Sequence, residues 1–306
     1  MSEAIPVILF AYARPIHLAR VLACLRENMV PLIYVFADGA KDATDRIAVN
    51  ESRALLHAVD WAELRLVTRS ANMGLGANVL DGVSKISEQH EAFIVWEDDL
   101  VCAPSTYFWL CEALRYYSMD ERVMSITGWT HPRVTPAGVT TEPYFDGRAE
   151  CWVWGTWARS WRGMEGETAL VKMALAAAGG LKPDAYGSDL PAMAYDEKRK
   201  NIWAVRWLYH HMQHGGLCLR PPWSMVDHIG EDAIATNCSD SGWMKQLSLC
   251  DAPQVPSVWP KVEENPQCAR LWRKVASSPG VMQRIKAYWR QLLVRWLNYY
   301  NRLNGI

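Results

Sequence analysis

The sequence predicts an α/β protein, in which a mostly parallel sheet is covered by helices on both faces. In the first half of the chain, apolar runs typical of strands alternate with amphipathic runs typical of helices. Polar and acidic residues directly follow several of the apolar runs, which is where ligands bind in open α/β sheets. The 306 residues are 50% hydrophobic and 21% charged, a composition that can bury a sizeable core.

Composition also excludes several classes of protein. The net charge of −1 gives the molecule no bias toward nucleic acid. No stretch approaches the ~18 consecutive apolar residues of a membrane span, and the first residues lack the basic charge of a signal peptide. The eight cysteines form no C-x-x-C pair and have no regular spacing, so we expect reduced thiols in a cytoplasmic protein.

The expected elements follow from where the apolar runs begin and end. Pro15 opens the first helix, because proline is favoured in the first turn. We expect strands over residues 5–11, 32–37, 64–68, 93–96, 123–126 and 222–226. We expect helices over residues 15–26, through the fifties, over 74–87 and over 104–117.

The order of these elements predicts one main domain over residues 1–251; we expect nucleotide binding in its half at 1–130, where the alternation is regular, and the acceptor side in its half at 131–251. In the second half the regular alternation gives way to turns and tryptophan-rich segments. Four prolines, at positions 253, 256, 260 and 266, indicate an extended linker over residues 252–268.

Residues 269–306 form the last part of the chain, a basic amphipathic tail. No acidic residue follows Glu264, and apolar and aromatic residues recur at helical spacing over residues 281–303. A helix of ~23 residues would be ~35 Å long. Its basic faces and aromatic stripe favour binding to an anionic membrane, which would place the protein on the inner face of the cytoplasmic membrane. The alternative is a helix that packs on the domain or on a dimer partner.

Three carboxylates, Glu97, Asp98 and Asp99, directly follow the apolar run over residues 92–96. Two such charges about 4 Å apart repel by roughly 4 kcal/mol at an effective dielectric constant near 20, so the group needs a cation or donors. Successive side chains on a strand point to opposite faces, which separates Asp98 from the other two. Mg²⁺ and Mn²⁺ take one or two carboxylates and fill their remaining positions with phosphate and water. We expect Asp99 to bind the metal and Glu97 and Asp98 to bind sugar or ribose hydroxyls; the alternative is a strand end with solvated acids.

Residues after three other expected strands should meet at the same edge of the sheet. The first strand ends at Ala11 and is followed by Arg14, which we expect near a diphosphate. The second ends at Asp38, whose carboxylate could accept the imide N–H of uracil. Asn72 and Gly74 follow the third, where glycine allows close backbone approach and the next helix begins with its N-terminus toward phosphate.

Five short segments stand out along the chain: FAYARP at 10–15, NMGL at 72–75, VWEDDL at 95–100, WVWGTW at 152–157 and WAVRW at 203–207. They resemble segments of the GT-A glycosyltransferases, most closely the bacterial transferases of surface-polysaccharide clusters. The acidic segment, followed by Ala103 and Pro104, also resembles N-acetylglucosaminyltransferase I. The resemblance covers roughly residues 5 to 240.

This resemblance implies transfer of a hexosyl or N-acetylhexosaminyl group, with inversion, from a nucleotide sugar to a glycan or lipid-linked acceptor in polysaccharide biosynthesis. It implies Mn²⁺ or Mg²⁺ at Asp99 and recognition of the uridine of a UDP-sugar near Asp38. A histidine completes the metal sphere in some GT-A enzymes, so His228 is a second candidate ligand, although a lone histidine is more often structural.

The catalytic base and the class of protein leave alternatives open. N-acetylglucosaminyltransferase I carries an aspartate in a Trp-Asp-Asp-Trp segment, where this chain has WAVRW. Asp196 is therefore the first candidate for the base, followed by Glu165 and Glu150. A sugar nucleotidyltransferase would share the sheet, but should carry a glycine-rich loop after the first strand. A non-catalytic carbohydrate-binding protein would explain the tryptophans, of which Trp154 and Trp207 are the candidates for stacking on sugars.

Overall fold

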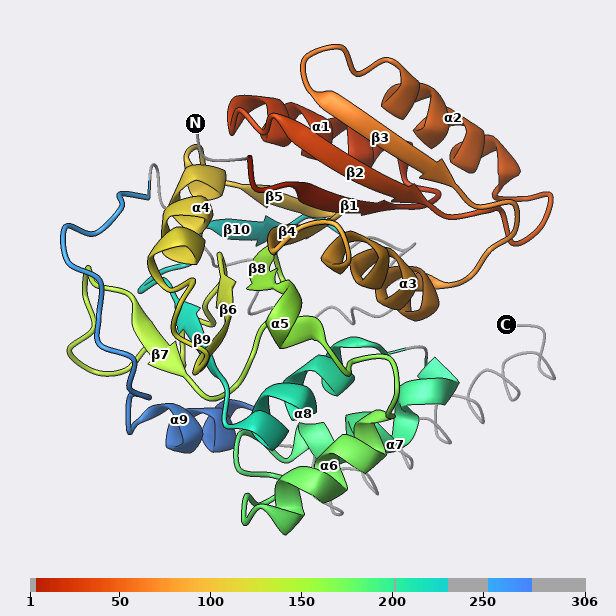
Figure 1. Cartoon of the computed structure of the whole chain (residues 1–306). Coiled ribbons are helices and arrows are strands. Elements are labelled where there is room, and N and C mark those ends of the chain that lie inside the picture. Colours follow the sequence, from red (N-terminus) through yellow and green to blue (C-terminus); the bar gives the residue numbers. More distant parts are fainter. Residues whose placement is uncertain (1–3, 201, 231–252, 277–306) are drawn as a thin grey trace, which may run out of the picture.

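The structure, a computed structural model, describes residues 4–200, 202–230 and 253–276 (Figure 1). Within these residues, eight strands form one sheet. In spatial order they are β3 (Glu63–Thr68), β2 (Leu32–Ala37), β1 (Val7–Ala11), β4 (Ala92–Glu97), β8 (Trp154–Trp157), β6 (Val123–Thr127), β9 (Leu217–Arg220) and β7 (Tyr144–Asp146). Strands β1 to β4 pair in parallel, as do β6 and β9, whereas β8 and β7 run against their neighbours. The prediction of an α/β fold with a mostly parallel sheet is confirmed.

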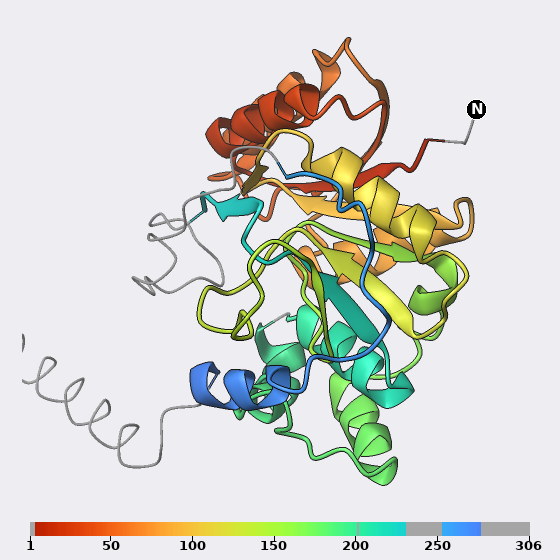
Figure 2. The same ribbon diagram turned by 90° about the vertical axis from the view of Figure 1, so that its left-hand side faces the viewer.

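Helices cover both faces of this sheet (Figures 1 and 2). Helices α1, α2 and α4 lie on one face, and α3 lies on the other face together with α5 and α8. The helices are α1 (Pro15–Glu27), α2 (Arg46–His57), α3 (Leu75–Ser87), α4 (Thr106–Tyr116), α5 (Ala158–Trp161), α6 (Ala169–Ala178), α7 (Asp189–Lys200), α8 (Ala204–His214) and α9 (Cys268–Val275). Strand β1 is fully buried and β4 nearly so, which explains why both are unbroken apolar runs.

A short antiparallel pair lies beside the end of β4. Strand β5 (Leu100–Cys102) follows the three carboxylates, and β10 (Val226–His228) pairs with it. The pairing sets His228 opposite Leu100. The strand expected over residues 222–226 is thus displaced toward the C-terminus, and its last residue reaches the acidic group.

The described part of the expected linker, residues 253–267, is extended and packs on the domain; we call it the strap. The Tyr117 hydroxyl donates to the Pro260 carbonyl oxygen at 2.7 Å, and the Asn265 N–H donates to the Phe145 carbonyl at 2.9 Å. The strap leads into α9, whose Trp272 is buried. The membrane-binding residues expected over 281–303 lie outside the described residues. Of the helices that the structure describes, none combines the length and apolarity that crossing a bilayer requires.

Candidate active site

Glu97, Asp98 and Asp99, which we call the acidic cluster, lie where β4 turns into β5. Strand β1 runs beside β4 with Phe10 opposite Glu97, so the residues after β1 flank the cluster on one side. Strand β10 flanks it on the other side through its pairing with β5. The structure therefore gathers the ends of β1, β4 and β10 around the three carboxylates.

The three carboxylates have different surroundings. Asp98 faces the end of β1 and accepts the backbone N–H of Tyr12 at 2.7 Å. Burial, reinforced by the charge of Asp99, raises the pKa of Glu97 to about 8 and the pKa of Asp98 to about 7. Burial also acts against the charge of Asp99, but bonds to His228 and Arg14 hold the pKa of Asp99 below its usual value. Asp99 is therefore the member of the cluster that stays ionised.

One oxygen of Asp99 meets two positively polarised groups. Its Oδ2 lies 2.6 Å from Arg14 Nη1 and 3.4 Å from His228 Nε2. The chain after β10 passes directly against this ion pair, because a Cβ on Gly230 would lie 2.4 Å from Asp99 Oδ2 and 2.8 Å from Arg14 Nη1. Arg14, Asp99 and His228, each singled out from the sequence, are thus brought together.

The donor set fits a divalent metal that uses few protein ligands. Two ligands of one Mg²⁺ or Mn²⁺ ion lie about 3 Å apart, close to the 3.4 Å between Asp99 Oδ2 and His228 Nε2. Among the described residues, no group of three His, Cys, Asp or Glu side chains is arranged to hold a metal ion. Asp99 and His228 would therefore leave most coordination positions to phosphate and water.

Trp152 forms an aromatic wall beside the cluster. Its ring stacks on the His228 ring, with centroids 4.9 Å apart and planes at 16°, and meets the Trp129 ring edge-on at 4.7 Å. The stack limits how the imidazole of His228 can turn. The two tryptophans expected to contact sugars, Trp154 and Trp207, are instead completely buried. Trp152, which is partly exposed, is the better candidate for a sugar contact.

Asp38 holds the turn that begins α3. Its Oδ1 accepts the N–H groups of Gly39 and Met73, both at 2.8 Å. Its Oδ2 accepts the Gly74 N–H at 3.0 Å and the Asn72 side-chain amide at 3.1 Å. These four bonds take up the acceptor capacity of a carboxylate. The expected contact with uracil therefore finds both oxygens already used, and the structure gives Asp38 a role in shaping the loop.

The three candidates for the base lie in different places. Asp196 is on α7, where its carboxylate is ion-paired at 2.8 Å with both Arg199 and Lys200. Glu165 is exposed in the turn between α5 and α6. Glu150 is followed by Cys151, and burial together with the charges of Glu150 and Glu97 raises the pKa of the Cys151 thiol. The charge of Glu150 therefore acts on the same thiol as the charge of Glu97, whereas Asp196 lies on α7 and Glu165 lies in the turn between α5 and α6.

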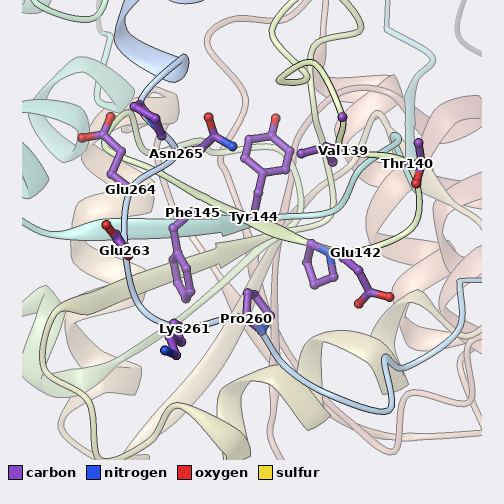
Figure 3. A pocket seen from close by; sticks show the side chains of 13 residues that line it. Val139, Thr140, Glu142, Tyr144, Phe145, Pro260, Lys261, Glu263, Glu264 and Asn265 are labelled. Atoms are coloured by element: carbon purple, nitrogen blue, oxygen red, sulfur yellow. The ribbon is translucent and has the colours of Figure 1, made fainter.

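A separate groove of about 460 Å³ lies between the strap and the loop before β7. Figure 3 shows its lining, in which Glu142, Tyr144 and Glu264 are prominent. The lining residues come from 138–145 and 260–266, so the groove is distinct from the acidic cluster. The residues that the sequence predicts for the site therefore lie outside this groove.

No protein-family model matches the chain, and no curated protein matches it significantly. Solved structures that align with it include a mannosyltransferase from Pyrobaculum calidifontis in complex with GDP-Man and Mn²⁺, at 15% identity and a TM-score of 0.36, covering 51% of this chain and 45% of that one. Another is HddC from Yersinia pseudotuberculosis complexed with GMP-PN, at 12% identity and a TM-score of 0.28, covering 47% and 60%. A third is a putative glucose-1-phosphate thymidylyltransferase from Bacillus anthracis, at 6% identity and a TM-score of 0.32, covering 55% and 77%. The chain spans less than half the length of the mannosyltransferase, and similarities this weak assign no function.

Proposed function

We propose that this protein is a metal-dependent glycosyltransferase of the GT-A type. It would transfer a hexosyl or N-acetylhexosaminyl group from a nucleoside-diphosphate sugar to a glycan or lipid-linked acceptor in surface-polysaccharide synthesis. The observation that carries the proposal is the single oxygen of Asp99 that faces both Arg14 and His228 at the carboxyl end of parallel strands. Such strand ends are where open α/β sheets bind nucleotides.

Each residue then has a defined task. Asp99 and His228 would hold Mn²⁺ or Mg²⁺, which neutralises the diphosphate leaving group. Arg14 supplies a second positive charge for a phosphate oxygen. Glu97 and Asp98 are proposed to bind ribose or sugar hydroxyls. Ala11, Asn72 and Gly74 belong to the strand ends and turns expected to form the nucleotide site.

Glu150 is proposed as the base. It takes the proton of the acceptor hydroxyl while the acceptor oxygen bonds to the anomeric carbon. The bond from that carbon to the phosphate oxygen breaks at the same time, and the diphosphate leaves with the electron pair. Attack opposite the leaving group inverts the anomeric configuration.

The metal assignment is tested by calorimetry of nucleotide binding with and without Mn²⁺. UDP, which the sequence favours, heads a panel that includes GDP. Asp99→Asn should weaken Mn²⁺-dependent binding by at least about 100-fold. Asp227→Asn is the matched control, because Asp227 neighbours His228 on β10 and its side chain points to the opposite face. Equal affinities of wild type and Asp99→Asn would refute the assignment.

The base is tested by turnover with a saturating donor. Glu150→Gln should lower kcat by about 10²- to 10⁴-fold and leave nucleotide affinity unchanged. Asp196→Asn serves as the comparison, since Asp196 is engaged with Arg199 and Lys200. A large loss in the Asp196 variant, with normal turnover in the Glu150 variant, would return the role to Asp196.

Two further assays separate the alternative classes. A nucleotidyltransferase would release pyrophosphate from a nucleoside triphosphate and a sugar phosphate; here β1 continues into AYARP and α1 opens at Pro15, without a glycine-rich loop. A carbohydrate-binding protein would be stabilised thermally by free sugars, and a transferase by UDP with Mn²⁺.

Membrane binding by residues 281–303 is a separate proposal. Deletion after Ser278 should reduce sedimentation with anionic vesicles and leave transfer to soluble acceptors unchanged. Equal sedimentation of both chains would contradict it.

A further inference from the structure

A buried cation lies directly behind Glu150. Arg220, at the end of β9, is completely buried, and its Nε lies 2.8 Å from Oδ2 of the equally buried Asp146 on β7. Its Nη2 donates to the Arg148 carbonyl oxygen at 2.8 Å. Burying a charge is costly unless the charge is paired, so Asp146 is what allows Arg220 to stay inside the protein.

The other end of the guanidinium faces Glu150. Arg220 Nη1 lies 3.7 Å from Glu150 Oε2, and Glu150 Oε1 accepts the backbone N–H of Cys151 at 3.0 Å. The side chain of Glu150 is 14% exposed, whereas that of Arg220 is 0% exposed. The carboxylate therefore has a fixed positive charge on its inner side and is itself partly exposed.

Helix α9 also contacts the ion pair between Arg220 and Asp146. The indole Nε1 of Trp272 donates to Asp146 Oδ2 at 2.7 Å. The Trp272 ring also lies beside two guanidinium groups, with Arg148 4.3 Å and Arg220 5.2 Å from its centroid. A residue of α9, the helix that follows the strap, thus reaches the ion pair behind Glu150.

We propose that Arg220, fixed by Asp146 and Trp272, is a positioning residue for Glu150. The proposal rests on the proposed function, in which Glu150 takes the proton of the acceptor. Displacing a catalytic group by about 1 Å can lower a rate by roughly 10²-fold, so a rigid support behind the carboxylate affects turnover directly. It also gives the C-terminal segment a role in catalysis through α9.

The experiment is a double-mutant cycle between Trp272 and Glu150. Trp272→Phe keeps an aromatic ring beside the guanidinium groups and removes only the N–H donated to Asp146. It should lower kcat about tenfold at unchanged donor KM in the wild-type background, and by less than about twofold in the Glu150→Gln background. Trp259→Phe is the matched control, because Trp259 lies in the strap and packs on Trp109 with ring centroids 5.5 Å apart, away from the ion pair.

Three outcomes are decisive. An unchanged kcat in Trp272→Phe, or an equal loss in both backgrounds, would overturn the positioning role. Loss of kcat in Trp259→Phe as large as in Trp272→Phe would also overturn it, because the effect would then be general to the segment. Nucleotide binding with Mn²⁺ is measured on every variant. If the wild type does not bind, the proposed function itself fails. If binding is normal but the effects of the Trp272 and Glu150 substitutions on kcat simply add, only the positioning role is rejected.

Discussion

Replacing Asp38 by asparagine should destabilise the fold, because this carboxylate holds together the loops after β2 and β3. Its two oxygens accept three backbone N–H groups and the amide of Asn72. Asparagine substitutes an NH₂ donor for one of these oxygens, so that donor faces donor on one side.

The magnitude follows from the bonds that are lost. If the NH₂ group takes the place of Oδ2, Asn72 can turn its own oxygen toward it, but then loses its 2.9 Å bond to the Gly39 carbonyl oxygen. With the NH₂ group at the Oδ2 position, the Gly74 N–H has no acceptor. With the NH₂ group at the Oδ1 position instead, the Met73 N–H loses its acceptor. Hydrogen bonds to a charged acceptor contribute about 1.5–3 kcal/mol each, so we expect Asp38→Asn to lower the free energy of unfolding by about 3 kcal/mol.

Urea unfolding of wild type and Asp38→Asn measures this difference. Asp42→Asn is the control, since Asp42 lies in the exposed turn before α2 and should change stability by less than about 0.5 kcal/mol. An Asp38→Asn protein of wild-type stability that loses affinity for UDP would refute the structural role and support recognition of uracil.

Three other predictions concern the core and the site. Burial lowers the pKa of His211 to about 3, so between about pH 6.5 and 3 only the unfolded chain binds that proton and stability falls as the pH drops. His211→Gln should flatten this fall by up to about 1.4 kcal/mol per pH unit in urea unfolding between pH 7 and 5, and an unchanged slope would contradict the assignment. Gly39→Ala should lower the free energy of unfolding by about 1–3 kcal/mol, because its Cβ would lie 2.4 Å from the backbone carbon of Ala71; unchanged stability would show that the loops can separate. Gly230→Ala should weaken Mn²⁺-dependent nucleotide binding by displacing Asp99, with a wild-type affinity as the contrary result.

The parallel strands could be predicted because their burial on both faces requires runs of apolar residues, which are visible in the sequence. Strands β1, β2 and β4 have helices on both faces, so their residues are almost continuously apolar. The acidic cluster was predictable for the same reason, as three charges follow one such run. The position of β8 was not, because it inserts antiparallel between β4 and β6 through pairings of distant segments.

Long-range pairing also decides which candidates form the site. His228 reaches Asp99 only because β10 pairs with β5, more than a hundred residues away in the chain. The sequence already argued against Asp196 as the catalytic base. Arg199 and Lys200 follow it at i+3 and i+4, a spacing typical of ion pairs on a helix surface. No local pattern distinguishes Glu150, whose carboxylate lies near Arg220, a residue 70 positions later in the chain.

Anomalous diffraction from crystals grown with Mn²⁺ and a nucleoside diphosphate tests the central claim most directly. The account predicts a manganese peak within about 2.3 Å of a carboxylate oxygen of Asp99 and of Nε2 of His228, bridged to the diphosphate. A manganese–nucleotide complex bound elsewhere, with Asp99 still paired to Arg14, would contradict it.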